Sequence, residues 1–393
     1  MPLNELLQRL VSLTPGQKSF LSVYLDLRPN RIGKKLYPVF LKTRLREISS
    51  LLPARAAEQS LCNQDIKRIQ KYLETELDPA WKGIAIFACA ADDLFLPIPM
   101  PLFPENDVTL SSIPQLFSLV RHKALYQTHA VVEANSRQAR LFLIRLGTLS
   151  KQINLSWENK HSTRFGRMGW SLPRFQRHLQ EHRKQRGKEI VENVKKLILR
   201  EKPEYLFLAA EEEMEAELKK QLPASLIKKM VPLSVLDLHA PDHKLLSTAA
   251  EVLRAISKEK AETFSKYILE EAEPLGRATS GTEATLSALQ NHQIERMVFD
   301  ARFKATGWGC PGCNSLGIGG VPRSCPYCQA TIFPSNLREK ILSKAQSQGV
   351  DLFFTENFSP LLKAGGVAAL LKYKTLKKTT GHYIARREKG YPM

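Results

Sequence analysis

Four of the six cysteines lie close together in the C-terminal part of the chain. Cys310-Pro311-Gly312-Cys313 is followed, after eleven residues, by Cys325-Pro326-Tyr327-Cys328. Two C-x₂-C pairs at this separation can place four thiolates around one tetrahedral Zn²⁺. Because such a site has no open position for water, we expect a structural ion and no catalytic role. A redox C-x-x-C motif is a weaker alternative, since it leaves the second pair unexplained, and a metal-free pair of disulfides is weaker still.

The two remaining cysteines are isolated from this cluster. Cys89 ends the apolar run 84–89, so we expect it to be a buried free thiol, and Cys62 stands alone. This usage fits a reducing compartment with one metal site and does not fit a disulfide framework.

The most basic stretch of the chain spans residues 160–188, where nine lysines and arginines accompany one acid, Glu181. Within it, Arg174, Arg177, Glu181, Lys184 and Lys188 are spaced so that a helix would carry four cations and one acid along one face. A solvated helix face is the usual interpretation of such a pattern. The residues that precede the helix favour a binding role instead.

The segment before this helix has the composition of a bendable loop with an aromatic tip. Gly166 and Gly169 allow the chain to bend, Ser171 can cap a helix, and Pro173 suits its first turn. Trp170 lies between them. A basic helix with an aromatic residue at its tip is suited to holding phosphates while stacking on a base. The alternative for Trp170 is a hydrophobic contact within its own domain.

The overall charge points to a polyanionic partner. Lysine and arginine number 58 against 39 acids, which gives a formal charge of +19. Nucleic acid is the usual partner of such a chain, because neutralising phosphates releases counterions; a membrane surface is the rival. No run of about 18 apolar residues predicts a spanning helix. The N-terminus lacks a signal-peptide pattern, so we expect a cytoplasmic protein without membrane partners.

Alternating strand and helix patterns predict an α/β fold, mixed α+β in detail, in three domains. Strands are expected at 20–27, 83–90, 130–134, 140–144, 205–210, 294–299, 350–354 and 367–373. Helices are expected at 41–52, 62–77, 189–200, 211 onward, 247–271, 282–289 and 337–348. The four prolines at 97–104 predict a loop near the first boundary. The expected domains are 1–118, 119–268 with the basic tip at 164–188, and 269–393 with a zinc ribbon at 308–330 and a basic tail.

The tip sequence resembles the signature of the archaeo-eukaryotic class-1 release factors. Gly166-Arg167-Met168-Gly169-Trp170-Ser171, with Arg174-Phe175 two residues later, matches a family loop that reads Gly-Arg-Gly-Gly-Gln-Ser before Arg-Phe and a basic helix. Residues 281–289 and 365–373 resemble the opening and closing segments of that family's C-terminal domain, between which some members carry a zinc-binding insertion. Residues 22–26 resemble the divergent bacterial branch, in which the codon-reading domain is replaced.

Two residues depart from the family's catalytic tip. Met168 replaces the first glycine of the Gly-Gly-Gln motif, and Trp170 replaces the glutamine that helps water attack the ester. Trp170 offers an N–H donor but no carbonyl acceptor, and Met168 would be strained where glycine adopts a positive φ. The chain is therefore most similar to the non-hydrolytic members, among them Pelota and the hibernation factor Balon. We expect no catalytic residue.

The resemblance implies a ribosome-binding factor in the A site of idle or stalled ribosomes, with its tip in the peptidyl transferase centre. The residues expected to contact ribosomal RNA are Arg164, Arg167, Met168, Gly169, Trp170, Arg174, Arg177 and Lys184. It also implies elongation factor Tu or another translational GTPase as a partner. One alternative is a rescue peptidyl-tRNA hydrolase of the same family, and another is a zinc-ribbon RNA-binding protein or nuclease.

Other sequence patterns add little chemistry. No Walker-type loop or dinucleotide fingerprint is present. The run Gly317-Ile318-Gly319-Gly320, between the two cysteine pairs, is expected to be a turn. His161, His178 and His182 flank the tip, and we expect them to add phosphate contacts and not to act as a general base.

Overall fold

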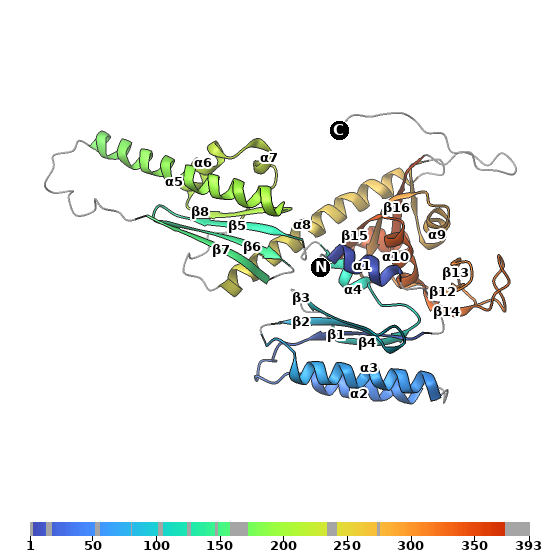
Figure 1. Ribbon diagram of the computed structural model, residues 1–393. Coiled ribbons are helices and arrows are strands. Elements are labelled where there is room, and N and C mark those ends of the chain that lie inside the picture. The colour runs from blue at the N-terminus through green and yellow to red at the C-terminus, as the bar shows by residue number, and fades with distance from the viewer. Residues whose placement is uncertain are drawn as a thin grey trace. The chain divides into compact units, whose positions relative to one another are not determined.

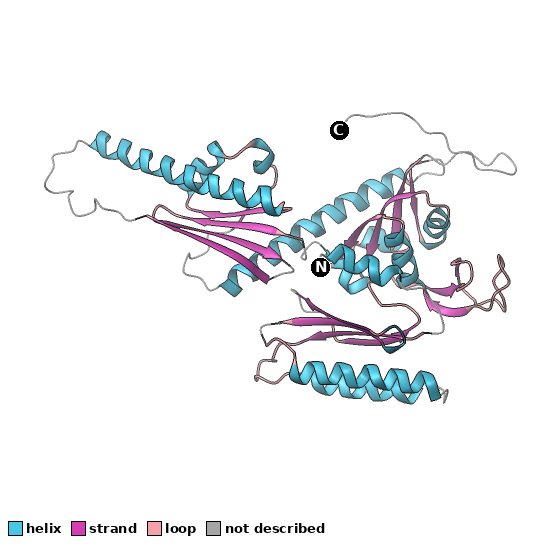
Figure 2. Ribbon diagram, viewed as in Figure 1, coloured by secondary structure: helices cyan, strands magenta, loops and turns pink. Residues whose placement is uncertain are grey.

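A computed structural model covers the 393-residue chain, and its elements are drawn in Figures 1 and 2. The structure describes residues 3–12, 18–51, 56–79, 81–100, 105–123, 127–145, 148–157, 172–233, 242–272 and 276–373. The chain divides into two compact units, one formed by residues 1–123 with 255–393 and the other by residues 124–254. The α/β fold class predicted from the sequence is confirmed; the three domain boundaries stay a prediction.

The N-terminal part of the first unit contains a four-stranded antiparallel sheet in the order β3-β2-β1-β4. Its strands are β1 (Phe20–Asp26), β2 (Gly83–Cys89), β3 (Leu94–Met100) and β4 (Asp107–Ser111). Helices α2 (Tyr37–Leu51) and α3 (Ala56–Thr75) run side by side along one face (Figure 1). The short helix η1 (Ala90–Asp92) follows β2, and α1 (Leu3–Ser12) lies nearest the N-terminus. The apolar side chains of the strands and the two helices form one buried core, which includes Cys62.

The loop predicted at the proline-rich segment is wrong for its first half. Pro97 and Pro99 lie within β3, opposite Ile86 and Ile84 of β2. Proline is tolerated here because β3 is an edge strand. Residues two apart in a strand direct their N–H groups to the same side, so both prolines can direct the missing donor away from β2. Pro101 and Pro104 lie outside the described residues.

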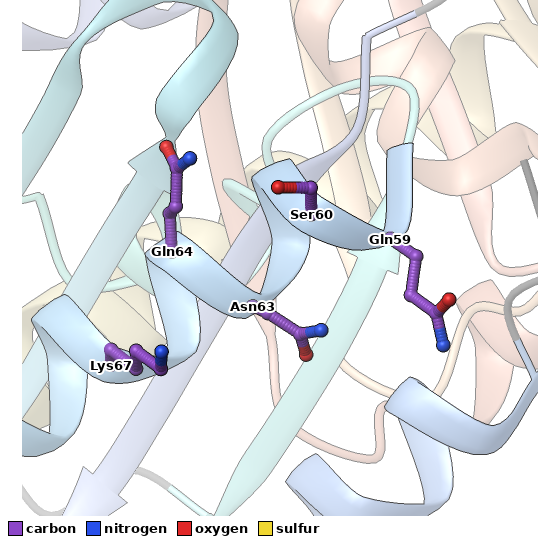
Figure 3. Close-up of a pocket in the computed structure, with 5 residues that line it drawn as sticks. All are labelled: Gln59, Ser60, Asn63, Gln64 and Lys67. Carbon is purple, nitrogen blue, oxygen red and sulfur yellow. The ribbon is translucent and has the colours of Figure 1, made fainter. Parts of the chain in front are cut away.

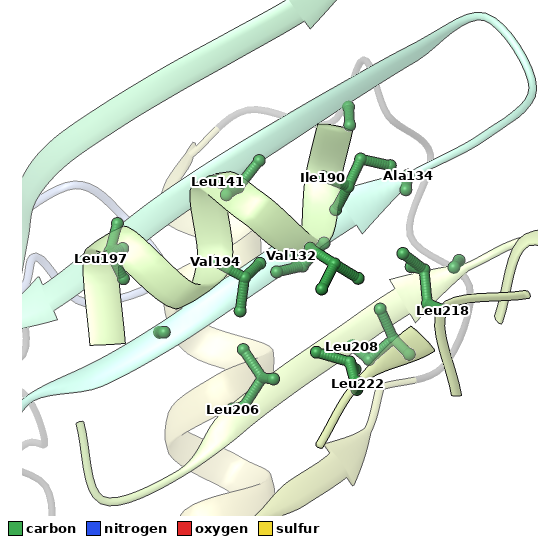
Figure 4. Close-up of a cluster of buried hydrophobic side chains, with 14 of the residues drawn as sticks. Val132, Ala134, Leu141, Ile190, Val194, Leu197, Leu206, Leu208, Leu218 and Leu222 are labelled. Atoms are coloured by element: carbon green, nitrogen blue, oxygen red, sulfur yellow. The ribbon is translucent and has the colours of Figure 1, made fainter. Parts of the chain in front are cut away.

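The second unit is a five-stranded sheet in the order β7-β6-β5-β8-β9, antiparallel on the β7 side and parallel from β5 onward. Its strands are β5 (His129–Ala134), β6 (Gln138–Arg145), β7 (Thr148–Ser156), β8 (Leu206–Ala210) and β9 (Met230–Pro232). Its helices are α5 (Leu172–Glu201), α6 (Glu212–Gln221) and α7 (Ala224–Ile227). Figure 4 shows how apolar side chains of α5 and α6 meet those of the sheet. Helix α5 confirms both the basic helix expected from Pro173 onward and its continuation at 189–200.

The C-terminal part of the first unit has a sheet in the order β10-β16-β11-β15, with β11 and β15 parallel. These strands are β10 (Ala278–Ser280), β11 (Ile294–Asp300), β15 (Asp351–Thr355) and β16 (Val367–Leu371). Its helices are α9 (Thr282–Gln290), α10 (Leu337–Ser347) and α11 (Ser359–Lys363). Helix α8 (Asp242–Glu271) has its residues up to 254 in the second unit and those from 255 in the first. A separate small sheet, β13-β12-β14, contains β12 (Thr306–Gly309), β13 (Leu316–Ile318) and β14 (Phe333–Asn336). No helix among the described residues is long and apolar enough to span a bilayer.

A buried carboxylate fastens the segment after the N-terminal sheet to the C-terminal part of the same unit. Glu339 of α10 is 2% exposed, and one of its oxygens accepts the backbone N–H groups of Leu116 and Phe117 at 2.9 and 3.1 Å. These residues begin α4 (Phe117–Arg121), whose Phe117 ring lies edge-on to the ring of Phe354. Burial raises the pKa of Glu339. The two N–H groups satisfy a charge that burial would otherwise penalise.

Candidate metal centre and basic helix

Each of the two cysteine pairs forms a backbone turn, and the two turns have the same pattern of hydrogen bonds. In the first, the N–H of Cys310 donates to the carbonyl of Ser315 at 2.9 Å, and the N–H of Asn314 donates to the carbonyl of Cys310 at 3.0 Å. The second pair repeats both bonds at Cys325 with the same distances, to Ala330 and from Gln329. This repetition over two segments is typical of paired metal knuckles.

Each turn ends with a residue in the left-handed region. Asn314 has a φ of 56° and Gln329 a φ of 62°. The backbone can reverse at these positions because asparagine adopts this conformation more readily than most residues, and glutamine is held there by the turn's hydrogen bonds. After the reversal, the backbone of each segment runs back toward the first cysteine of its pair.

The four sulfur atoms converge on one point. All lie within 4.8 Å of one another, and the Sγ atoms are 3.4 Å apart for Cys310 and Cys328 and 3.5 Å apart for Cys313 and Cys325. Tetrahedral zinc with Zn–S bonds of about 2.3 Å would place the sulfurs roughly 3.8 Å apart. The four thiols therefore fit one metal ion. Among the described residues this is the one group of three or more potential ligands with that geometry.

The cluster is covered on one side. Cys310 and Cys325 are buried and pack with Trp308 and Ile332, whereas Cys313 and Cys328 are exposed. Four thiolates this close would repel one another without a cation, and the burial of Cys310 and Cys325 weakens the screening of that repulsion by solvent. The arrangement can hold an ion and join two strand ends; it leaves no position for a substrate.

A hydroxyl beside the cluster was missed by the sequence analysis. Ser315 Oγ lies 3.1 Å from Cys313 Sγ, and its hydrogen bond lowers the pKa of Cys313 to about 6. A stabilised thiolate is the form that binds a metal. The sequence signal that could have identified Ser315 is its position two residues after the second cysteine of the first pair.

The small sheet behind the cluster depends on two glycines. Gly317 pairs with Trp308 across β12 and β13, and a Cβ on Gly317 would come within 2.2 Å of the Trp308 indole. The turn expected at residues 317–320 is therefore wrong for its first half: Gly317 and Ile318 belong to β13. The chain turns afterwards, where Gly319 has a φ of 82°.

The long helix α5 has two halves with different surroundings. Its C-terminal half buries Ile190, Val191, Val194 and Leu197 in the core of the second unit. Between residues 176 and 186 no side chain is buried. Figure 1 shows this N-terminal part of α5 extending past the end of β8. A helix that is polar all round is not stabilised by a core of its own. The N-terminal part of α5, here called the arm, therefore depends on the packed C-terminal half for its stability.

Contacts with α6 mark where the packed half ends. Gln221 Nε2 donates to the carbonyl of Lys184 at 3.0 Å, and Arg183 forms an ion pair with Glu213. A Cβ on Gly187 would meet Gln221 Nε2 at 3.1 Å, so glycine lets the two helices approach closely. Residues 172–182 extend beyond these contacts, which makes an arm of roughly 16 Å at 1.5 Å per residue.

The strand that leads toward the tip is fixed to α5 as well. Trp157 follows β7, and its indole N–H donates to the Glu189 carboxylate at 2.8 Å. The guanidinium of Arg186 lies 5.7 Å from the centre of the Trp157 ring. Both ends of the segment that carries the predicted tip are thus attached to the same helix.

Several predicted RNA-contact residues fall outside the described residues. These are Arg164, Arg167, Met168, Gly169 and Trp170, as well as His161 and the capping Ser171. Arg174 lies in the first turn of α5, but its side chain is also outside the described part. Their roles stay predictions. Pro173 does lie in the first turn of the helix, as expected.

The described cations of the predicted stripe lie on the exposed surface of α5, Arg177 and Lys184 in the part without buried side chains and Lys188 at the start of the packed half. Arg177, Lys184 and Lys188 are exposed, and within the described ranges none of them forms an ion pair. The rings of His178 and His182 contact each other, with their Nε2 atoms 2.9 Å apart. These three described cations of the predicted stripe are therefore at the surface, where an anionic partner could reach them.

A hollow on α3 shows no comparable chemistry. It measures about 460 Å³ and is lined by Gln59, Ser60, Asn63, Gln64 and Lys67, all from one helix (Figure 3). Catalysis usually combines a nucleophile with a nearby base, and the lining residues described here include no histidine, cysteine or carboxylate.

Comparison with known proteins points to one family for the middle of the chain. Residues 114–254 match the family described as bacterial archaeo-eukaryotic release factor family 10. None of the curated proteins matches the chain.

Solved structures of translation factors are among the similar folds. An archaeal translation termination factor, aRF1, is 13% identical, with 94% of this chain and 97% of that chain covered and a TM-score of 0.26. Pelota of Archaeoglobus fulgidus is 12% identical, with 74% and 80% covered and a TM-score of 0.36. Dom34 of S. cerevisiae is 12% identical, with 71% and 73% covered and a TM-score of 0.34. Identities and scores this low do not transfer activity or partners.

The family match includes β5–β9 and α5, together with the sequence of the predicted tip. The resemblance to Balon in particular stays a prediction. Residues 114–254 are thus similar to the bacterial archaeo-eukaryotic release factors of family 10, which confirms for this segment the family resemblance predicted from the sequence.

Proposed function

We propose that the protein is a ribosome-binding factor that occupies the A site of idle or stalled ribosomes. The observation that carries this proposal is the exposed N-terminal part of α5, whose cations follow the release-factor-like tip in the sequence. The arm belongs to the segment that matches the release factor family. Release factors act on ribosomes, and the arm would direct the tip toward the peptidyl transferase centre.

The charges of the arm suit ribosomal RNA. Arg177, Lys184 and Lys188 are exposed, so a phosphate can approach them without displacing a carboxylate partner described in the structure. Each phosphate that they neutralise would release a counterion and favour binding. Arg164, Arg167 and Arg174 would extend this contact toward the tip.

The tip itself supports binding without hydrolysis. Met168 and Trp170 replace two residues of the family's Gly-Gly-Gln motif. An indole can stack on a base or block the site, but it has no oxygen that could accept a proton from the attacking water. We therefore propose a non-catalytic factor that protects ribosomes, as in hibernation. Peptidyl-tRNA hydrolysis is the outcome that would contradict this proposal.

The C-terminal part of the chain would provide a structural metal site and a surface that binds a partner protein. We propose that Cys310, Cys313, Cys325 and Cys328 hold one structural Zn²⁺, because a tetrahedral Cys₄ set is a common zinc site. Family C-terminal domains dock translational GTPases, so elongation factor Tu or a related GTPase is the proposed partner. These roles place the protein in the cytoplasm.

The test is co-sedimentation with 70S ribosomes over a range of salt concentrations. We expect the wild type to bind and Arg177→Gln/Lys184→Gln to bind more weakly, with the salt dependence reduced by an amount that reflects about two phosphate contacts. The matched control is Lys195→Gln/Lys196→Gln, which removes two exposed charges from the packed half of the same helix. Equal losses in both variants, or no wild-type binding, would contradict the proposal.

A further inference from the structure

A second concentration of positive charge lies in the N-terminal part of the chain, far in sequence from α5. Residues 28–46 contain seven lysines and arginines and no aspartate or glutamate. They form the loop between β1 and α2 and most of α2 itself. Figure 1 shows this loop at one end of the N-terminal sheet. No role has been assigned to it above.

The loop is built as a rigid turn. Asn30 Oδ1 accepts the N–H groups of Ile32 and Lys34 at 3.1 and 2.9 Å, while the backbone of Asn30 bonds to Lys34 and Gly33 at 2.9 Å. Gly33 has a φ of 78°, which glycine adopts without strain. The turn therefore holds its side chains in a fixed arrangement before any partner binds.

Apolar side chains project from this turn into solvent. Ile32 is 83% exposed, Val39 is 65% exposed and Leu36 is 56% exposed. Between them Tyr37 is buried in the core of the sheet and anchors the start of α2. A fixed loop that exposes three aliphatic side chains is unfavourable unless a partner covers them.

Most of the surrounding cations are available to a partner. Arg28 is paired with Asp26, and Arg44 is paired with Glu47. Five others are exposed and form no ion pair within the described part of the chain: Arg31, Lys34, Lys35, Lys42 and Arg46. Val39, Lys42 and Arg46 are three and four residues apart, so they share one face of α2 and continue the surface of the loop.

We propose that residues 28–46 form a second RNA-binding surface. The five cations would neutralise backbone phosphates, and Ile32 would insert beside a base or into a groove, as apolar wedges of other nucleic-acid-binding proteins do. A fixed turn lowers the ordering cost of such insertion. The inference does not depend on ribosome binding, because it concerns RNA contact by the N-terminal part alone.

An anionic membrane fits these residues less well. Loops and helices that insert into lipid usually expose tryptophan or phenylalanine at the insertion point. Here the exposed side chains are aliphatic, and the one aromatic residue between them, Tyr37, is buried. Lys34 and Lys35 lie between Ile32 and Leu36, so burying both apolar residues in acyl chains would also bury the charges.

The test compares two charge-removal variants of the full chain in their affinity for a labelled RNA hairpin at several salt concentrations. Lys34→Gln/Lys35→Gln removes two cations of the loop. Lys67→Gln/Lys71→Gln removes two exposed lysines of α3 as the matched control. We expect the loop variant to raise Kd about tenfold and to lower the salt slope by about 1.4 to 1.8, and the control to stay within about twofold.

A third variant separates the shape of the loop from its charge. Asn30→Ala keeps every cation but removes the side-chain oxygen that holds the turn. We expect a few-fold loss of affinity with an unchanged salt slope, and an unchanged melting temperature of the N-terminal part. Equal effects of the two lysine pairs would overturn the proposal, because binding would then report net charge only. It would also be overturned if phosphatidylserine vesicles bind and Ile32→Ser abolishes that binding without changing RNA affinity.

Discussion

The cysteine cluster and the basic arm of α5 differ in how their residues are held. In the cluster, two identical turns and a small sheet fix every sulfur within 4.8 Å of the others. On the arm, the cations are attached to a helix that is packed only in its other half. The geometry of the cluster is therefore set within the protein, whereas the cations of the arm face solvent and are proposed to bind a polyanion.

Because of this difference, we expect substitutions in the cluster to reduce folding stability and substitutions on the arm to reduce binding. Removing a ligand from a closed metal site leaves charged sulfurs without a cation, which costs folding energy. Removing a charge from an exposed arm costs the folded protein little and costs the complex more. The following experiments test that contrast.

The largest effect is expected from a cysteine ligand. Cys310→Ser should abolish binding of one metal ion per chain and unfold the small sheet, since binding of structural zinc to zinc-finger peptides contributes on the order of 10–16 kcal/mol. Metal content after gel filtration and hydrogen exchange of residues 306–336 would measure it. Cys62→Ala, buried outside the cluster, is the control and should keep the metal. A metal-containing Cys310→Ser protein would refute the assignment.

The second largest effect is expected from acid, which should weaken metal binding by the cluster. Protons compete with the metal for thiolates, so metal affinity should fall as pH falls, by at least about 100-fold between pH 7 and 5. Lysine and arginine side chains in general keep their charge over this range. Chelator competition at several pH values would measure the release.

A substitution at Ser315 should change the pH at which the metal is released. Its hydrogen bond lowers the pKa of Cys313 to about 6, so this ligand stays a thiolate above that pH and is protonated below it. Ser315→Ala should raise the pKa of Cys313 and move the midpoint of metal release to higher pH. A midpoint that does not move would show that Ser315 has no part in holding the metal.

A packing change within the ribbon should have a smaller effect. Gly317→Ala would place a Cβ against the Trp308 ring, and overpacking of this kind typically costs about 1–3 kcal/mol. Gly320→Ala is the matched control, because nothing lies within 4 Å of a Cβ there. Hydrogen exchange in the small sheet would show the difference; equal protection in the two variants would count against the packing described.

The smallest effect on folding is expected on the arm. Arg177→Gln/Lys184→Gln should change the free energy of unfolding by less than about 0.5 kcal/mol, as is usual for exposed positions. Denaturant unfolding would measure this. A loss of several kcal/mol would mean that these cations stabilise the second unit and are not reserved for a partner.

The sequence predicted the elements that carry strong local signals. The cysteine spacing located the metal cluster, and the apolar runs located β1, β2, β5, β8, β11 and β16. It failed where the decisive contact is not local. Pro97 and Pro99 are compatible with a strand only because β3 has a free edge. β7 is polar and alternates weakly, so its pairing with β6 was not evident.

The candidate site was predicted unevenly for the same reason. The four cysteines could be identified from their spacing because all the ligands lie within nineteen consecutive residues, 310–328. Ser315 was missed, since its role depends on where the first turn ends. The basic segment 28–46 was missed because its charges are divided between a loop and the start of α2, and its exposed Ile32 is distinguished only by the turn that Asn30 holds.

Peptide release on the ribosome tests the central claim most directly. The wild type would be compared with Met168→Gly/Trp170→Gln, which restores both family residues of the tip, on 70S ribosomes that carry peptidyl-tRNA. We expect the wild type to bind these ribosomes and to release no peptide, while the restored tip gains release activity. Release by the wild type at a rate that Trp170→Ala abolishes would contradict it and identify the protein as a hydrolase.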